Sequence, residues 1–192
     1  MSEQTFTTIA ENIKNRRTIK PGMMNGQKIP NAQVAALLEL ADWAPTHAFT
    51  EPWRFVVYED PKVFCAQHAE IYKAGAGENF NPATYNNLAN MGANVSHVVI
   101  AYMHRSELSK IPVVEEIAAA SCAIQNILLG ATSLNIGSFW STGGATLKPG
   151  MKEFLDLGAD DQVLGLLYLG YSETHPDGVR KTPLEEKVKW VQ

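Results

Sequence analysis

The sequence predicts a three-layer α+β fold in which a mixed central sheet is flanked by helices. Four short apolar or β-branched segments are separated by helical patterns of very different lengths. One of these helical patterns is apolar on almost every side, which is typical of a central, buried helix. The 192 residues suffice for one domain with a trailing arm, and no internal repeat divides the chain.

The N-terminal third predicts two helices and a strand. Apolar residues recur at helical spacing over residues 6–13, and the pattern stops at a basic segment. A second helix begins near Pro30 and ends before Pro45, because a proline disfavours helical geometry in the residue before it. A loop with two prolines then leads into a β-rich strand over residues 53–58.

Helices and strands continue to alternate through the rest of the chain. Asp60-Pro61 is a favourable helix start, since proline is well tolerated in the first helical turn. Glycine and proline positions mark the loops. The predicted elements are a helix over 60–72, a loop over 75–82, a short helix to about residue 90, a strand over 97–103, the long apolar helix over 112–133, a strand over 136–141, a helix over 150–155 and a strand over 163–169.

The predicted domain covers residues 1–171, and residues 172–192 form a C-terminal arm. The arm holds two prolines, many charges and little periodicity. It nevertheless ends with Val188, Trp190 and Val191, which need a surface to cover them. The arm is therefore suited to packing on another subunit.

Composition excludes several classes of function. The net charge of −4 argues against nucleic acid as a partner, and the lysines and arginines do not cluster along one long segment. The longest apolar run, residues 163–169, is too short to cross a bilayer, and the N-terminus lacks the apolar stretch of a signal peptide, so we expect a cytoplasmic protein. Cys65 and Cys122 fall in predicted helices and are expected to be buried thiols.

Common catalytic and cofactor motifs are absent. The five histidines lack metal-ligand spacing, so no metal is expected. The pair Gly75 and Gly77 follows a helix and lacks the third glycine of a dinucleotide-binding turn. There is no P-loop. No serine lies within G-x-S-x-G, and this excludes the nucleophile elbow of an α/β-hydrolase.

A basic cluster suits an anionic ligand. Arg16, Arg17, Thr18 and Lys20 place three cations and a hydroxyl at a helix-to-loop junction. Guanidinium groups bind phosphate through paired hydrogen bonds, and a lysine acts as a point charge. The alternative is a solvated basic turn that caps the end of the helix.

Three further strings have both a functional and a structural interpretation. The stiff loop 44–53 holds His47 and aromatic rings, and is either a binding loop or a rigid connector. Residues 137–144 place an aromatic pair before hydroxyls and glycines, which suits a heteroaromatic ring or an ordinary strand-to-turn junction. The basic string 178–184 is either a ligand-binding part of the arm or a solvated tail.

Taken together and in this order, these strings resemble the nitroreductase family of FMN-dependent oxidoreductases, in particular its small single-domain members. The segment 16–20 is similar to the family's Arg-x-Ser-x-Lys/Arg element, and Ala44 to Trp53 resembles its Ala-Pro…Pro-Trp motif. The resemblance implies that His47 approaches the flavin of the neighbouring subunit. The implied cofactor-binding residues are Arg16, Arg17, Thr18, Lys20, His47, Trp140, Ser141, Thr142 and Arg180.

The resemblance also implies the reaction and the assembly. Two subunits would exchange C-terminal arms in a homodimer, with each FMN at the interface. NADH or NADPH would reduce the flavin, leave, and be replaced in the same pocket by a small acceptor such as a nitroaromatic or a quinone, which gives ping-pong kinetics. The flavin carries the chemistry, so no side chain is expected to act as a classical catalytic residue.

Two residues depart from the family pattern. Glu51 stands before the Pro-Trp pair, where an amide is usual, and Trp43 stands where several relatives have a basic residue. A carboxylate at Glu51 is expected to change acceptor preference or to point away from the site. Because fold does not settle chemistry, dehalogenation, enone reduction, flavin fragmentation and a non-catalytic flavin-binding role remain alternatives.

Overall fold

The computed structural model describes residues 2–191, so Met1 and Gln192, the outer ends of the predicted domain and arm, lie outside the described residues. The helices and strands follow the predicted order. They are α1 (Ser2–Asn15), α2 (Asn31–Asp42), β1 (Trp53–Tyr58), α3 (Pro61–Ala76), α4 (Pro82–Asn90), β2 (His97–Met103), α5 (Val113–Ser133), β3 (Gly137–Ser141), α6 (Pro149–Phe154) and β4 (Gln162–Gly170), with short 3-10 helices η1 (Pro21–Met23), η2 (Gly77–Asn79) and η3 (Leu184–Glu186).

The four strands form one sheet in the order β1-β2-β4-β3. All three neighbouring pairs are antiparallel. The sheet is mixed only in that Thr18 forms a single parallel bridge with Ser138 on the edge strand β3. The segment that follows α1 therefore lies along the outer edge of the sheet, next to β3.

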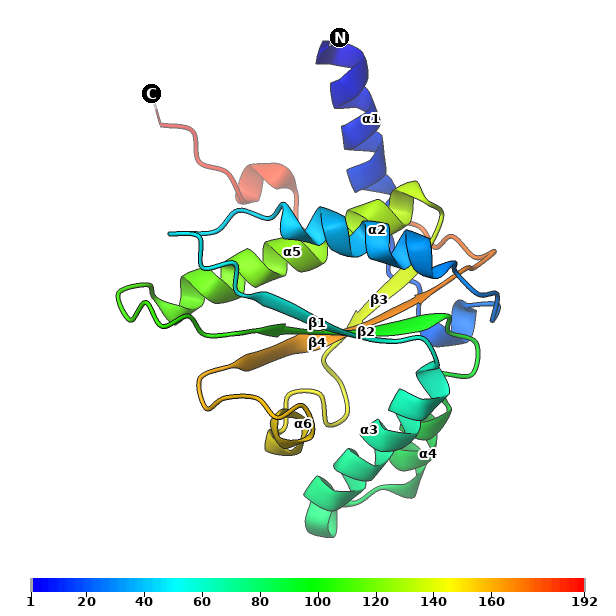
Figure 1. Ribbon diagram of the computed structural model, residues 1–192. Coiled ribbons are helices and arrows are strands. Elements are labelled where there is room, and N and C mark those ends of the chain that lie inside the picture. Colours follow the sequence, from blue (N-terminus) through cyan, green and yellow to red (C-terminus); the bar gives the residue numbers. More distant parts are fainter. Residues whose placement is uncertain (1, 192) are drawn as a thin grey trace.

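Helices cover both faces of the sheet and give the three predicted layers (Figure 1). α2 and α5 lie on one face, and α3, α4 and α6 on the other. Successive side chains of a strand point to opposite faces, so β2 contributes to two separate cores. Val99, Ala101 and Met103 pack with α2 and α5, whereas Val98 and Ile100 pack with α3 and Met151 of α6.

Local signals explain where the helices begin. The Asp60 side chain accepts a hydrogen bond from the amide of Lys62 at the start of α3, and Asn81 caps α4 in the same way. The predicted loop over 75–82 is wrong in its first half, because α3 continues to Ala76 and η2 follows directly. A Cβ atom at Gly75 would meet no other atom within 4 Å, so no close contact requires glycine at this position of the helix.

α5 is the central helix of the domain. It is long and apolar enough to cross a membrane by length and composition, a property that core helices share, and 44% of its apolar window is buried inside the domain. Its exposed side includes Val114, Ala118, Cys122 and Gln125 at helical spacing. The prediction that both thiols are buried is wrong for Cys122, which is exposed, and correct for Cys65.

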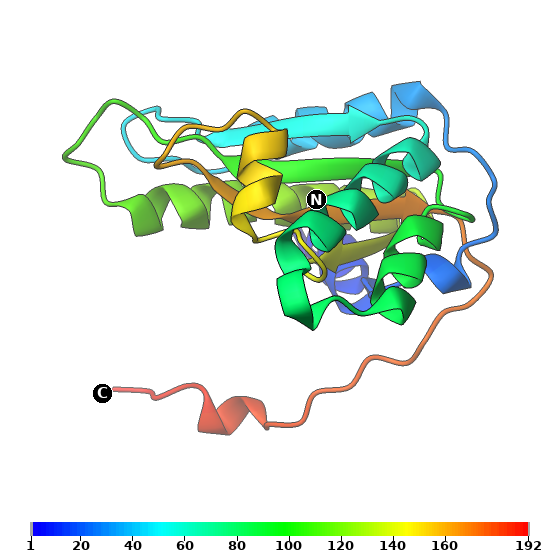
Figure 2. The same cartoon turned by 90° about the horizontal axis from the view of Figure 1, so that it is seen from below.

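α1 and the C-terminal arm project from the body on the α5 side of the sheet (Figure 1). Figure 2 shows the arm running away from the domain. α1 exposes an apolar stripe of Phe6, Ile9 and Ile13. The arm exposes Val179, Leu184 and Trp190, the last with 88% of its surface accessible. Exposed apolar side chains in this number mark an interaction surface.

A buried ion pair anchors the loop between β2 and α5. Glu116 is 1% exposed, pairs with Arg105 and accepts a hydrogen bond from the amide of Ser106. Burial pushes the pKa of Glu116 upward, but its hydrogen bonds with Ser106 and Arg105 outweigh burial, so the pKa lies below its ordinary value. Arg105 also donates to the carbonyl of Ile111 at 2.7 Å.

Candidate functional site

Four of the predicted site residues line one hollow of about 290 Å³ between the 16–18 segment, β3 and α5. Their polar side chains have no hydrogen-bond partner among residues 2–191 except for the Trp140 indole. Three residues that the sequence did not single out complete the wall. The lining consists of Arg16, Thr18, Gln125, Leu128, Ser138, Trp140 and Thr142.

The parallel bridge to β3 places Arg16 and Thr18 at the hollow. The amide of Ile19 donates to the carbonyl of Ser138 at 2.9 Å, and the Ile19 side chain is buried in the core. Side chains alternate along an extended segment, so Arg16 and Thr18 line the hollow beside β3 while Arg17 lines a different pocket.

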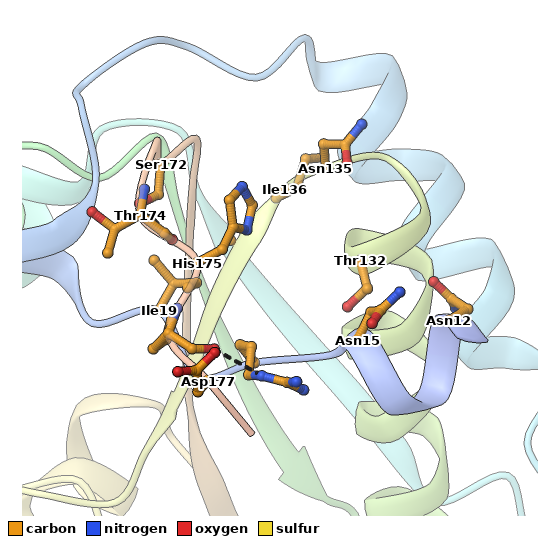
Figure 3. A pocket seen from close by; sticks show the side chains of 13 residues that line it. Asn12, Asn15, Ile19, Thr132, Asn135, Ile136, Ser172, Thr174, His175 and Asp177 are labelled. Carbon is orange, nitrogen blue, oxygen red and sulfur yellow. Dashed lines mark hydrogen bonds between the residues drawn. The ribbon is translucent and has the colours of Figure 1, made fainter. Parts of the chain in front are cut away.

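Arg17 binds backbone carbonyl groups on the other side of this segment. Its guanidinium donates to the carbonyls of Lys14, Arg16 and Pro176, the last at 2.9 Å. Figure 3 shows this second pocket, of about 450 Å³, with Ser172 to Asp177 of the arm facing α1 and the end of α5. Arg17 therefore tethers the arm to the domain.

The Trp140 indole forms a fixed wall of the hollow. Its Nε1 donates to the carbonyl of Leu164 at 2.9 Å, which orients the ring. Gly165, at φ 151°, provides the space, since a Cβ atom there would clash with the indole. Ser141 does not line the hollow, and its hydroxyl accepts a hydrogen bond from the amide of Gly143 at 3.3 Å.

The structure places Lys20, His47 and Arg180 away from this hollow. Lys20 is exposed just before η1. Arg180 lies in the exposed arm, where its guanidinium donates to the carbonyl of Val179. His47 pairs through Nδ1 with Glu115 at 2.7 Å, in the first turn of α5.

Loop 43–52 holds His47 in a constrained conformation. Ala48, Phe49 and Glu51 all have positive φ, a region that non-glycine residues seldom adopt. The Thr46 hydroxyl accepts a hydrogen bond from the amide of Glu51 and supports the turn. Phe49 is 89% exposed, and Trp43 is exposed at the end of α2. The loop is therefore rigid while its aromatic rings face solvent.

Sequence reasoning missed Gln125, Leu128 and Ser138 in the hollow and His68 behind it. Gln125 carries a weak signal, because Gln125 and Asn126 interrupt the apolar middle of α5. His68 has no sequence signal, although it is 1% exposed and accepts a hydrogen bond at Nε2 from the amide of Ala145 at 3.0 Å.

His68 makes the stability of the domain dependent on pH. Burial lowers its pKa from 6.5 to about 4. Below pH 6.5 the His68 side chain is protonated in the unfolded chain, but in the folded chain it stays neutral until the pH reaches about 4. The free energy of unfolding therefore falls by about 3 kcal/mol between pH 6.5 and pH 4. Above pH 6.5 the group contributes no pH dependence.

Urea denaturation measures the free energy of unfolding at about pH 7 and about pH 4.5. The decrease between the two pH values is expected to be smaller for His68→Gln than for the unchanged chain. Equal losses in both proteins would contradict this assignment.

The chemistry of the hollow suits an anionic group joined to a flat ring. An uncommitted guanidinium, three hydroxyls and an amide face the same space as an indole and a leucine side chain. Among the described residues, no carboxylate lines it. Within residues 2–191, no group of three or more His, Cys, Asp or Glu side chains forms a potential metal site. A larger hollow of about 630 Å³, between α3 and residues 144–153, contains none of the predicted site residues.

Comparison with known proteins agrees with this fold. The family model described as the nitroreductase family matches residues 13–171. YfhC of Bacillus subtilis, provisionally named an NAD(P)H nitroreductase, is 24% identical over 177 residues, which is 91% of this chain and 90% of that protein.

Solved structures share the architecture. A nitroreductase-like family protein from Bacillus cereus superimposes with a TM-score of 0.80 at 24% identity, over 96% of each chain. A nitroreductase with bound FMN from Bacteroides fragilis superimposes with a TM-score of 0.69 at 22% identity, over 96% of this chain and 98% of its own. The family match spans most of the domain, including the strands and helices that surround the hollow, and the chain belongs to the nitroreductase family of oxidoreductases.

Proposed function

We propose that this protein binds FMN in the hollow beside β3 and passes electrons from NADH or NADPH to a small acceptor, such as a nitroaromatic or a quinone. The observation that carries the proposal is the convergence of Arg16, Thr18, Trp140 and Thr142, far apart in the sequence, on one hollow. The FMN bound in the relative from Bacteroides fragilis supports the identity of the cofactor.

The donor set fits FMN. Arg16 would bind the phosphate, because its guanidinium is uncommitted and matches phosphate geometry. Thr18, Thr142 and Gln125 offer hydroxyl and amide groups to a polyol chain or to ring edges. The Trp140 and Leu128 side chains give the ring an apolar wall that excludes water. FMN, when bound, supplies the two-electron redox chemistry, and these residues hold and orient it.

A homodimer would complete the site. A hollow of about 290 Å³ is at the lower limit for a ligand site, so one chain offers only part of a cofactor site. Glu115, the partner of His47, lies ten residues before Gln125 on α5, or about 15 Å along the helix. In a two-fold dimer with antiparallel α5 helices, His47 of one subunit would approach the hollow of the other. The arms would then cover the partner and bring Arg180 to a shared site.

The first experiment is the visible spectrum of the purified protein, recorded without oxygen before and after addition of NADH or NADPH. A flavin band that bleaches on addition of the nicotinamide supports the proposal, and turnover is then assayed with nitroaromatic and quinone acceptors. A colourless protein that takes up no added FMN would contradict it.

Ala118→Arg is expected to convert the dimer to a monomer. Ala118 lies on the exposed side of α5, between Val114 and Cys122, where a partner helix would approach closely. Burying an unpaired guanidinium at a helix contact costs several kcal/mol, on the order of the whole gain from pairing. Sedimentation at micromolar concentration measures the mass, and Gln67→Arg, exposed on α3, is the matched control. If the Ala118→Arg protein remains a dimer, the subunit interface does not include this side of α5.

A further inference from the structure

α3, which carries His68, lies on the far face of the sheet from α5 (Figure 1), and the His68 side chain contacts the segment that follows β3. Its ring is 1% exposed and stacks on Phe64 with the ring centroids 5.6 Å apart. Its Nε2 lies 3.0 Å from the amide nitrogen of Ala145. Its Nδ1 has no hydrogen-bond partner among the described residues. This contact joins α3 to the turn between β3 and α6 through a single side chain.

The direction of this hydrogen bond fixes the protonation state of His68. A backbone amide can only donate, so Nε2 must accept and carries no proton. The proton of the neutral ring therefore lies on Nδ1. Burial keeps the ring neutral, since it lowers the pKa of His68 to about 4. The acceptor is thus present throughout the neutral pH range.

The contacted amide belongs to a tight turn over residues 143–146. The Thr146 hydroxyl donates to the carbonyl of Gly143 at 2.6 Å, and the amide of Gly143 donates to the Ser141 hydroxyl at 3.3 Å. Gly144 has φ 64°, and a Cβ atom there would lie 3.0 Å from the His68 ring and 2.8 Å from the Leu88 side chain. The ring and the turn backbone are therefore packed directly against each other.

This turn follows directly after the residues that line the hollow. Trp140 and Thr142 are lining residues, and Ser141 between them is hydrogen-bonded to the turn. The Trp140 ring is fixed at its other end by the carbonyl of Leu164. Residues 140–142 are thus held on one side by β4 and on the other by the turn, and His68 is the side chain from another helix that accepts from the amide of that turn.

We propose that His68 is a positioning residue for the cofactor site: its neutral Nε2 holds the 143–146 turn, and the turn, through its hydrogen bond with Ser141, holds Thr142 in the geometry that binds FMN. This inference rests on the proposed function, because it takes FMN as the ligand of the hollow. It assigns a role to a buried residue that never touches the cofactor.

Substitutions that differ only in where they place an acceptor test the proposal. In His68→Gln the amide oxygen can occupy the place of Nε2, whereas in His68→Asn the shorter amide reaches only the place of Nδ1. His97→Leu is the control, because His97 is equally buried but bonds Ser96 and Asn31 instead of the turn. The apo proteins are titrated with FMN, and quenching of flavin fluorescence gives Kd. Hydrogen exchange of the Ala145 amide is measured by mass spectrometry.

His68→Asn is expected to weaken FMN binding about tenfold, the equivalent of one lost hydrogen bond, and to speed exchange at Ala145. His68→Gln is expected to remain within about threefold of the unchanged protein. His97→Leu should lower stability without changing Kd.

Three results would overturn the role of His68 while leaving FMN binding intact. They are unchanged affinity in His68→Asn, equal weakening in His68→Gln and His68→Asn, and equal weakening in His97→Leu. An unchanged protein that binds no FMN overturns the proposed function, and the role of His68 with it.

Discussion

Arg105→Leu is expected to lower the free energy of unfolding by about 3–5 kcal/mol, the cost of leaving a buried charge without its partner. Glu116 is 1% exposed and would lose its ion pair with the guanidinium. The Ile111 carbonyl would lose its hydrogen bond as well. Urea denaturation followed by circular dichroism measures the change.

Two comparisons separate this effect from a general loss of charge. Glu115→Gln removes the neighbouring carboxylate, whose pair with His47 is exposed at 43% and 62%, and is expected to cost less than about 1 kcal/mol. The double variant Arg105→Leu with Glu116→Leu should recover part of the stability, because an apolar pair can replace a buried ion pair. A double variant as unstable as the single one would show that the Arg105 contacts other than Glu116 dominate.

Arg16→Ala is expected to weaken FMN binding by roughly 10- to 150-fold, the range for loss of charge-assisted hydrogen bonds. Arg16 has the only guanidinium that lines the hollow, and its side chain has no hydrogen-bond partner within the described part of the chain. Fluorescence titration of the apo protein measures Kd.

Riboflavin provides the internal control, since it lacks the phosphate that Arg16 is proposed to bind. The unchanged protein and Arg16→Ala should bind riboflavin equally, and Lys62→Ala, an exposed cation on α3, should leave both ligands unaffected. If Arg16→Ala weakens the binding of riboflavin and FMN equally, Arg16 contacts a part of the cofactor other than the phosphate. Unchanged FMN affinity would remove Arg16 from the site.

The sequence was sufficient for the elements of the fold because their signals are local. Strands β1 and β2 have the predicted bounds, since β-branched and aromatic runs end at turn residues. Helices α3 and α4 begin at Asp-Pro and Asn-Pro pairs, where a cap and a fixed φ act together. The first half of the predicted loop 75–82 was wrong, because Gly75 lowers helix propensity but α3 continues through it to Ala76.

The site depends on pairings that no local pattern contains. The sequence grouped Arg16 and Arg17, but the bridge between Thr18 and Ser138 sends them to different pockets. Cys122 was expected to be buried because α5 is apolar on nearly every side, and such a helix does not reveal which side lacks a neighbour within its own chain. The contact of His68 with the 143–146 turn depends on the packing of α3 beside that turn, and no local pattern predicts this packing.

The Arg17 guanidinium links the segment beside the hollow to the start of the arm. The same guanidinium holds the carbonyl of Arg16, at the hollow, and the carbonyl of Pro176, in the arm. Two attachments that share one guanidinium can influence each other only reciprocally: a ligand at Arg16 that tightened the arm would bind more weakly, by the same factor, to a chain with a shortened arm.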